Sequence, residues 1–348
     1  MDDFKGDHYH LNDLGDPNYF HQPIDISQFP SEYYIFALKR MKLIRRSEEI
    51  LGENVNNGQI KCPCHLSIGQ EAIPVGISRF LNNNDYVFGN HRSHGHYLSM
   101  TDNIHKLFAE TLGKVTGTSK GMGGSMHVVS SEHGFHGSVP IVSGTIPIAV
   151  GAGLTSKLKN EGRVSVSYFG DGTTEEGTFH ESLNLASFYK VPVLFVCENN
   201  LFSSHMHINE RQPFDSVSRF AIPHKITNVT IDGNDLNEVF KVAEEAIFKL
   251  RNGEGPFFLE AVTYRWRGHV GPDENIDVGL RRKEDLNLWK KRDPIGRLEL
   301  ALLSSKKLTK QNIKQINNEI EQIVKNAWLQ AIDDPYPKSD QLFDTVYY

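Results

Sequence analysis

The segments RVSVSYFGDG at residues 163–172 and VPVLFVCENN at residues 191–200 are the most informative about the fold. In the first segment, polar and apolar residues alternate toward an apolar end, and the segment stops at a tight Gly-Asp-Gly turn. This pattern predicts a strand. The second segment is an apolar run, which is typical of a strand buried on both faces of a parallel sheet. Between them, residues 175–189 place most apolar side chains on one helical face. Together they predict a β-α-β unit with parallel strands.

The rest of the chain continues this rhythm in both directions. Upstream, apolar residues at helical spacing predict a helix over 31–52 that Gly52 ends, and another helix starts near residue 70. Downstream, residues 227–231, 236–250 and 256–263 predict strand, helix and strand, and residues 309–332 predict a last helix. We therefore expect an α/β fold with a parallel sheet and helices on both faces. The expected organisation is an irregular arm at 1–30, one domain at 31–335 and a tail at 336–348.

Composition and charge exclude several classes of protein. The 348 residues carry a formal charge of −6, so binding to nucleic acid is not expected. The longest uncharged stretch, residues 133–156, contains five glycines and two prolines, which predicts packed backbone and no membrane span. The acidic, polar start resembles neither a secretory signal nor a transit peptide, and three cysteines are too few for a disulfide framework. We therefore expect a cytoplasmic protein.

The Gly-Asp-Gly turn and the pair Asn199–Asn200 stand at the ends of the two predicted strands, with 26 residues between them. The carboxyl ends of parallel strands meet at one edge of the sheet, where α/β folds bind ligands. Glycines let the backbone approach a diphosphate, and a helix N-terminus expected near Thr173 would stabilise its charge. Asp171 and an asparagine oxygen are ligands that suit Mg²⁺. The spacing therefore indicates a site for a diphosphate and a metal ion.

These residues resemble the thiamine diphosphate motif. The chain as a whole resembles the α-subunit of the decarboxylating first component of 2-oxo acid dehydrogenase complexes, including the pyruvate and acetoin types. Four further segments follow the order of that family: HLSIGQEA at 65–72, NHRSHGH at 90–96, GMGGSMH at 121–127 and TYRWRGH at 263–269. The resemblance covers about residues 31–335 and implies a thiamine diphosphate-binding fold, with thiamine diphosphate and Mg²⁺ as cofactors.

The resemblance also implies roles for particular residues. Mg²⁺ would be held by Asp171, Asn200 and the carbonyl of Phe202. The guanidinium of Arg92 would pair with a phosphate oxygen, for which its fixed fork is suited. The catalytic residues would be His269, in transfer to a lipoyl arm, with His65 and His94 beside it at the mouth of the site as positioning or proton-relay groups. Cofactor contacts would come from His91, Arg92, Ile141, Ser143, Gly170, Asp171, Gly172, Thr173, Asn200, Phe202 and His269.

The activity implied by the resemblance is decarboxylation of a 2-oxo acid or cleavage of acetoin, with acyl transfer to lipoamide. A β-subunit would complete the cofactor site in an α2β2 heterotetramer, and a lipoyl domain would accept the acyl group. Two alternatives stay open at this stage. One is a split transketolase-like or stand-alone synthase without a lipoyl acceptor, because the polar segment at 202–207 is unfamiliar for the family. The other is a regulatory or structural subunit that keeps the fold but not turnover, against which the intact Asp171, Asn200 and His269 argue.

One histidine departs from the family pattern. His91 stands where the family commonly has tyrosine, so a phosphate contact is expected to change or to be lost. The spacing of His91, His94 and His96 occurs in zinc sites, but no cysteine or carboxylate lies nearby in the sequence to complete four ligands. We therefore expect no zinc site within this segment.

Overall fold

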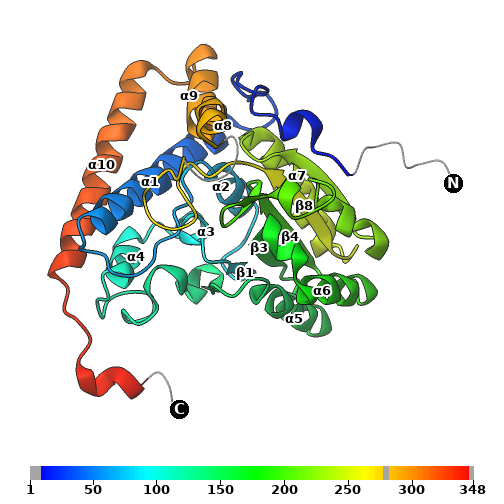
Figure 1. The fold of residues 1–348 in the computed structure, drawn as a ribbon, viewed down its shortest axis with the longest axis horizontal. Helices are drawn as coiled ribbons and strands as arrows, with labels where there is room; N and C mark the ends of the chain where they lie inside the picture. Colours follow the sequence, from blue (N-terminus) through cyan, green and yellow to red (C-terminus); the bar gives the residue numbers. More distant parts are fainter. Residues whose placement is uncertain (1–8, 277–281, 345–348) are drawn as a thin grey trace.

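The computed structural model of the chain describes residues 9–276 and 282–344. Its centre is a six-stranded parallel sheet with the strand order β2-β1-β3-β4-β8-β7. Figure 1 labels the central strands β1, β3, β4 and β8, which follow one another across the sheet. The strands are β1 (Tyr86–Gly89), β2 (Phe135–Ser138), β3 (Ser165–Gly170), β4 (Val193–Asn199), β7 (Thr227–Asp232) and β8 (Phe257–Val262). A short antiparallel pair, β5 (Phe202–Ser203) and β6 (Met206–His207), follows β4. The predicted α/β fold with a parallel sheet is confirmed.

Helices surround this sheet. They are α1 (Ser31–Asn56), α2 (Ala72–Ser78), α3 (His94–Met100), α4 (Ile104–Thr111), α5 (Thr145–Leu158), α6 (Gly177–Phe188), α7 (Leu236–Arg251), α8 (Arg282–Trp289), α9 (Pro294–Ser304) and α10 (Lys310–Asp333). The unit β3-α6-β4 is the one that the sequence predicted, and β7-α7-β8 repeats it with parallel pairing of β7 and β8.

Alternation along the strands divides the core into two layers. On β4, Leu194 and Val196 belong to a cluster that includes side chains of α1, α2, α7 and α10. Phe195 and Cys197 point the other way, into a cluster with side chains of α5 and α6. Successive strand residues face opposite sides of a sheet, so each strand contributes to both layers. Helices therefore cover both faces, as predicted.

Helix α1 runs four residues beyond Gly52, so the prediction that Gly52 ends this helix is wrong. A Cβ atom at Gly52 would lie 3.2 Å from both Leu66 Cδ1 and Pro272 Cβ. The glycine is needed for close packing inside the helix and not for a stop. The two segments that pack against Gly52 contain His65 and His269, and this packing brings the two histidines close together.

The turn after β3 also differs from the prediction. Residues Asp171–Glu175 form a 3₁₀ turn, and α6 begins only at Gly177, because Glu176 is extended with φ −87° and ψ 139°. The expected helix N-terminus near Thr173 is therefore wrong. Backbone groups of the short turn, and not the end of α6, lie beside the cavity described below.

The described part of the N-terminal arm is irregular apart from one 3₁₀ turn at Asn12–Leu14, and it packs on the domain. The amide of Leu11 donates a hydrogen bond to Asp215, and Arg292 donates one to the carbonyl of Leu14. Among the described residues, no helix is both long enough and apolar enough to cross a membrane.

Candidate active site

A cavity of about 170 Å³ opens where β3 and β4 end. Gly170 on β3 lies opposite Glu198 on β4, so the residues that follow the two strands face the same edge of the sheet. Ligands bind at this edge in open parallel sheets. The cavity is lined by His65, Gln70, Asn90, His91, Arg92, Met126, Pro140, Val142, Gly170, Asp171, Gly172, Thr173, Glu198, Asn200, Phe202, Ser203, Ser204, Arg265 and His269.

Asp171 and Asn200 bring oxygen atoms to the cavity from the two strand ends. The Oδ1 atom of Asp171 is buried and has no hydrogen-bond partner in the part of the chain that the structure describes, whereas Oδ2 accepts from Arg211. Burial raises the pKa of Asp171, and Arg211 offsets this only in part. The amide of Asn200 is held by donation to Gln70 Oε1 at 3.0 Å. An unpartnered buried carboxylate oxygen beside an oriented amide suits a hard cation.

Two buried guanidinium groups face the same cavity. Arg92 is 3% exposed and donates to the backbone carbonyls of Leu66 and His269, and Arg265 is 1% exposed and donates to the carbonyl of Ser204. Neither has a carboxylate oxygen within 4.0 Å among the described residues. Burial lowers the pKa of Arg92 to about 10 and that of Arg265 to about 9. Buried cations without counter-ions are costly, so this arrangement indicates an anionic ligand.

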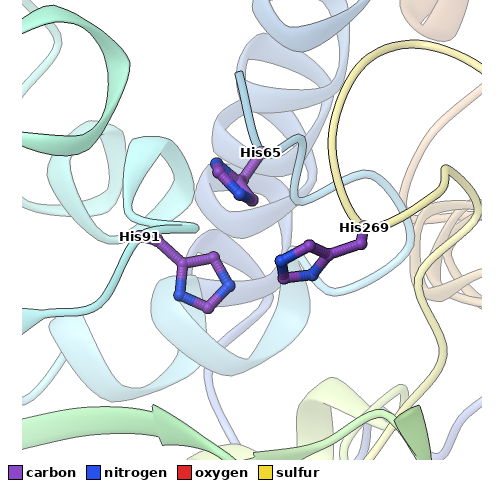
Figure 2. A group of neighbouring side chains, drawn as sticks. All are labelled: His65, His91 and His269. Atoms are coloured by element: carbon purple, nitrogen blue, oxygen red, sulfur yellow. The ribbon is translucent and has the colours of Figure 1, made fainter. Parts of the chain in front are cut away.

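Three histidines from separate segments meet beside these arginines (Figure 2). The ring centroid of His65 lies 4.7 Å from that of His91 and 5.0 Å from that of His269. Burial lowers the pKa of His65 to about 3, of His91 to about 2 and of His269 to about 4, and the charge of Arg92 adds to each shift. All three imidazoles are therefore neutral at neutral pH in the protein alone.

His94, Ile141 and Ser143 are the predicted site residues that do not line the cavity. The mouth position expected for His94 is wrong, because this side chain is fully buried between Glu48 Oε2 and Ser125, at 3.1 Å and 2.8 Å. Ile141 is 71% exposed, and Ser143 binds Thr178 through its hydroxyl. Their neighbours Pro140 and Val142 do line the cavity, so the segment borders it.

Comparison with known protein families matches residues 39–340 to the dehydrogenase E1 component family. The chain is 35% identical over 316 residues to the acetoin:2,6-dichlorophenolindophenol oxidoreductase α-subunit of Bacillus subtilis, covering 91% of this chain and 94% of the relative. It is 34% identical over 322 residues to the pyruvate dehydrogenase E1 α-subunit of Rhizobium meliloti, covering 92% of each. The chain belongs to the dehydrogenase E1 component family.

Membership in the E1 family implies thiamine diphosphate as the cofactor. It also implies a β-subunit as the partner, since both relatives are named as α-subunits. The resemblance that the sequence motifs indicated is therefore confirmed. A dehydrogenase is favoured over the synthase that the polar segment at 202–207 left open.

Several residues of this E1 site were not found by sequence reasoning. Arg265 and Gln70 lie in two of the segments that resemble the family, but the sequence alone predicts no role for them. Glu198 is the last but one residue of β4, and its carboxylate binds buried His96 at 3.1 Å. Asn199, the first of the asparagine pair, binds Glu260 at 2.7 Å and supports the strand end, whereas Asn200 reaches the cavity.

Glu48 was also not predicted from the sequence. It supports the E1 site by holding His94 and Ser67 in place. Its buried carboxylate accepts from His94 and from the amide and hydroxyl of Ser67, at 2.9 Å and 2.6 Å. Burial favours the uncharged forms, but the pair outweighs it, so the pKa of Glu48 lies below 4.5 and that of His94 above 6.5. The sequence does contain a signal for Glu48, because this glutamate lies on the otherwise apolar face of α1.

Replacing Glu48 with glutamine is expected to lower the free energy of unfolding by about 3 kcal/mol, because it leaves a buried charge without its partner. The stabilisation by Glu48 is lost as pH falls below 4.5, and that by His94 is lost as pH rises through its raised pKa. The loss of free energy of unfolding in Glu48→Gln should therefore be largest between pH 4.5 and 6.5. Urea denaturation of the full chain measures it.

Glu49→Gln is the matched control, because the neighbouring Glu49 is 40% exposed and pairs with Arg46 on the surface of α1. It should change the free energy of unfolding by less than about 0.5 kcal/mol. Equal losses in the two variants would contradict a buried Glu48–His94 ion pair.

Proposed function

We propose that the chain is the α-subunit of a thiamine diphosphate- and Mg²⁺-dependent dehydrogenase that acts on a small 2-oxo acid, such as pyruvate, or on acetoin. The observation that carries the proposal is one cavity that combines an unpartnered carboxylate oxygen of Asp171 with the unpaired guanidinium groups of Arg92 and Arg265. An anion is needed to balance the two guanidinium groups, and a cation would fill the vacant side of Asp171 at Oδ1, whose other oxygen pairs with Arg211. A metal diphosphate supplies both charges at once.

The residues fit the proposed cofactor. Asp171, Asn200 and the carbonyl of Phe202 would hold Mg²⁺, which usually takes few protein ligands and completes its shell with phosphate oxygens and water. Arg92, with Gly170 and the turn that follows it, would contact the diphosphate. A Cβ atom at Gly172 would lie 2.5 Å from Ser203 Oγ, so no larger residue fits between this turn and the β5 strand. That close approach keeps the backbone amides of Gly172 and Thr173 against the cavity.

The histidines would handle the substrate. When bound, thiamine diphosphate supplies the carbon nucleophile that adds to the carbonyl group of the substrate. His65 and His269 are neutral in the protein alone and stand at the cavity, where either ring can accept a proton or orient a carbonyl oxygen. The anionic cofactor would offset the charge of Arg92 and raise the pKa of both rings toward neutrality. His94 would act only indirectly, through Ser125 and Glu48.

The β-subunit would cover the outer face of α5 and α6. This face carries large exposed apolar side chains: Ile148 is 54% exposed, Leu158 74% and Phe188 78%. Val142 is both 46% exposed and part of the cavity lining, so the apolar face is continuous with the site. Exposed apolar surface of this kind marks a protein–protein contact. A partner seated here would close the cavity from outside, which supports an α2β2 assembly with shared cofactor sites.

Introducing a charge on this face should weaken the assembly. Ile148→Asp places a carboxylate in the proposed interface, and we expect the affinity for the β-subunit to fall at least about tenfold, as measured by analytical ultracentrifugation. Leu329→Asp is the control, because Leu329 is 50% exposed on α10, away from α5 and α6. If both variants assemble like the unchanged chain, the β-subunit does not bind at α5 and α6.

The proposed activity is tested with the chain and the β-subunit combined. With thiamine diphosphate and Mg²⁺, we expect reduction of an artificial electron acceptor by pyruvate or acetoin, and acyl transfer when a lipoyl domain is added. The isolated chain should not turn over. Full activity of the isolated chain would contradict the need for a partner. Carbon–carbon bond formation without acceptor reduction would identify a synthase instead.

A further inference from the structure

Cys62 and Cys64 form a pair of thiols that the proposed cofactor site does not use. They are separated only by Pro63, in the segment between α1 and His65. Cys62 is half-buried and lines a cavity of about 460 Å³ together with residues 121–124, whereas Cys64 is 1% exposed. The Sγ atom of Cys64 turns back toward residue 62 and lies 3.6 Å from the carbonyl oxygen of Cys62. One thiol of the pair is therefore open to small molecules, and the second lies beside it.

The surroundings of Cys62 favour the reactive form of its thiol. A hydrogen bond from the thiol of Cys64 lowers the pKa of Cys62, burial opposes this, and the amide of Ser125 and the charge of His94 add to the lowering. The same hydrogen bond, together with burial, raises the pKa of Cys64. The thiolate is the nucleophile in cysteine chemistry. The pair therefore combines an accessible thiolate with a protonated neighbour, as an attacking and a resolving cysteine do.

The backbone allows the two sulfur atoms to join. Consecutive Cα atoms are about 3.8 Å apart, so those of Cys62 and Cys64 lie at most about 7.6 Å apart. A disulfide accepts Cα separations of about 4.4–6.8 Å, which overlap with this range. The ring closed in this way is small and strained, and strained disulfides are readily reduced. A bridge between these residues would therefore form and break reversibly and would not be a permanent staple.

We propose that Cys62 and Cys64 are an oxidant-sensing thiol pair, which a peroxide converts into a reversible disulfide within the chain. The thiolate of Cys62 attacks one oxygen of hydrogen peroxide, which breaks the O–O bond, leaves a sulfenic acid on Cys62 and releases hydroxide. The sulfur of Cys64 then attacks the sulfur of this sulfenic acid, and the hydroxyl group leaves as water with the proton of the Cys64 thiol. The thiol pair loses the electrons that the peroxide gains.

The bridge would reach the active site through a contact on each side. A Cβ atom at Gly124 would lie 3.2 Å from Cys62 Cβ and 3.4 Å from Cys62 Sγ, so the reduced side chain packs against the loop that leads to Met126. Met126 lines the active-site cavity, and His65, which also lines it, directly follows Cys64. Joining the two sulfur atoms would draw Cys62 away from Gly124 and shift the segment that carries His65. On the proposed function, oxidation should therefore lower the activity of the α–β complex reversibly.

Mass spectrometry of the unchanged full chain tests the thiol pair. The chain is treated with a small excess of hydrogen peroxide and denatured, and its free thiols are blocked with N-ethylmaleimide before digestion. We expect the peptide that contains both cysteines to be lighter by two hydrogen atoms and to carry no maleimide, whereas Cys197, which is buried on β4, stays free. Dithiothreitol should restore both thiols. Labelled thiols at 62 and 64 after peroxide, a sulfinic acid at Cys62 without a bridge, or a disulfide between two chains would each overturn the proposal.

A pair of variants tests the role of each thiol. Cys64→Ser removes the resolving thiol, so Cys62 should remain as a sulfenic acid, which dimedone traps. Cys197→Ala is the matched control, because it removes a buried thiol outside the pair, and its yield of the bridge should stay within about twofold of the unchanged chain. A dimedone adduct that is as abundant in the unchanged chain as in Cys64→Ser would contradict the role of Cys64. Neither readout depends on turnover, so a failure of the proposed dehydrogenase activity would be seen separately.

Discussion

Asp171→Asn is expected to abolish Mg²⁺-dependent binding of thiamine diphosphate, with a loss of affinity of at least about 100-fold. The substitution keeps the size of the side chain but removes its charge. The Oδ1 atom of Asp171, which is buried and has no hydrogen-bond partner among the described residues, would lose the charge that binds Mg²⁺. Calorimetric titration of the α–β complex measures the affinity, and turnover should fall by at least about 1,000-fold.

The matched control is Asp102→Asn, an exposed aspartate in the loop before α4. It should bind the cofactor like the unchanged chain. Asp171 also forms an ion pair in the protein alone, because the guanidinium of Arg211 binds Oδ2 of Asp171 and the side chain of Glu175. In Asp171→Asn this ion pair is lost, so the melting temperature must be compared as well. Tight Mg²⁺-dependent binding by the variant would remove Asp171 from the metal site.

His269→Asn is expected to lower kcat by about 100- to 1,000-fold, a larger effect than the loss of affinity for thiamine diphosphate, which the imidazole is also expected to contact. The side chain of His269 lies at the cavity next to His65, and only its backbone carbonyl binds Arg92. Asparagine therefore removes the imidazole but keeps the carbonyl that positions the guanidinium. Steady-state kinetics of the α–β complex, with and without a lipoyl domain, separate the step that is affected.

His205→Asn is the control for this variant. His205 is exposed and close enough to His269 to lower the pKa of the latter, but it does not line the cavity. We expect its kcat to stay within about twofold of the unchanged value. Loss of cofactor affinity in His269→Asn, without a change in kcat at saturation, would show that His269 acts in binding and not in catalysis.

The fold was predictable because local pattern and global topology agree. Alternation over 163–169 and the apolar run at 191–196 each match one strand of the observed sheet, and their parallel pairing follows from the helix between them. The errors fall where packing overrides local preference. Gly52 looks like a helix stop, but its missing Cβ admits the chain at Leu66 and Pro272. Only the folded arrangement distinguishes these two uses of glycine.

The positions of site residues that directly follow a strand could be predicted from the sequence. The positions of site residues that depend on contacts with residues distant in the sequence could not. Asp171 and Asn200 come directly after adjacent strands, so topology alone brings them together. His94 was expected beside them, but the orientation of its side chain depends on Glu48. This glutamate lies on α1 and holds the imidazole ring in the core. His91 was considered with His94 and His96, whereas the loop before α3 directs it to His65 and His269. Sequence spacing carries no information on such contacts.

On the proposed function, this chain holds thiamine diphosphate through a metal ion, in a cavity that a β-subunit completes. The decisive experiment is calorimetric titration of thiamine diphosphate into the chain, with and without the β-subunit, in Mg²⁺ or in excess chelator. We predict one cofactor per α-chain, bound tightly only when Mg²⁺ and the β-subunit are both present. Equal binding in chelator, or none to the complex in Mg²⁺, would contradict the account.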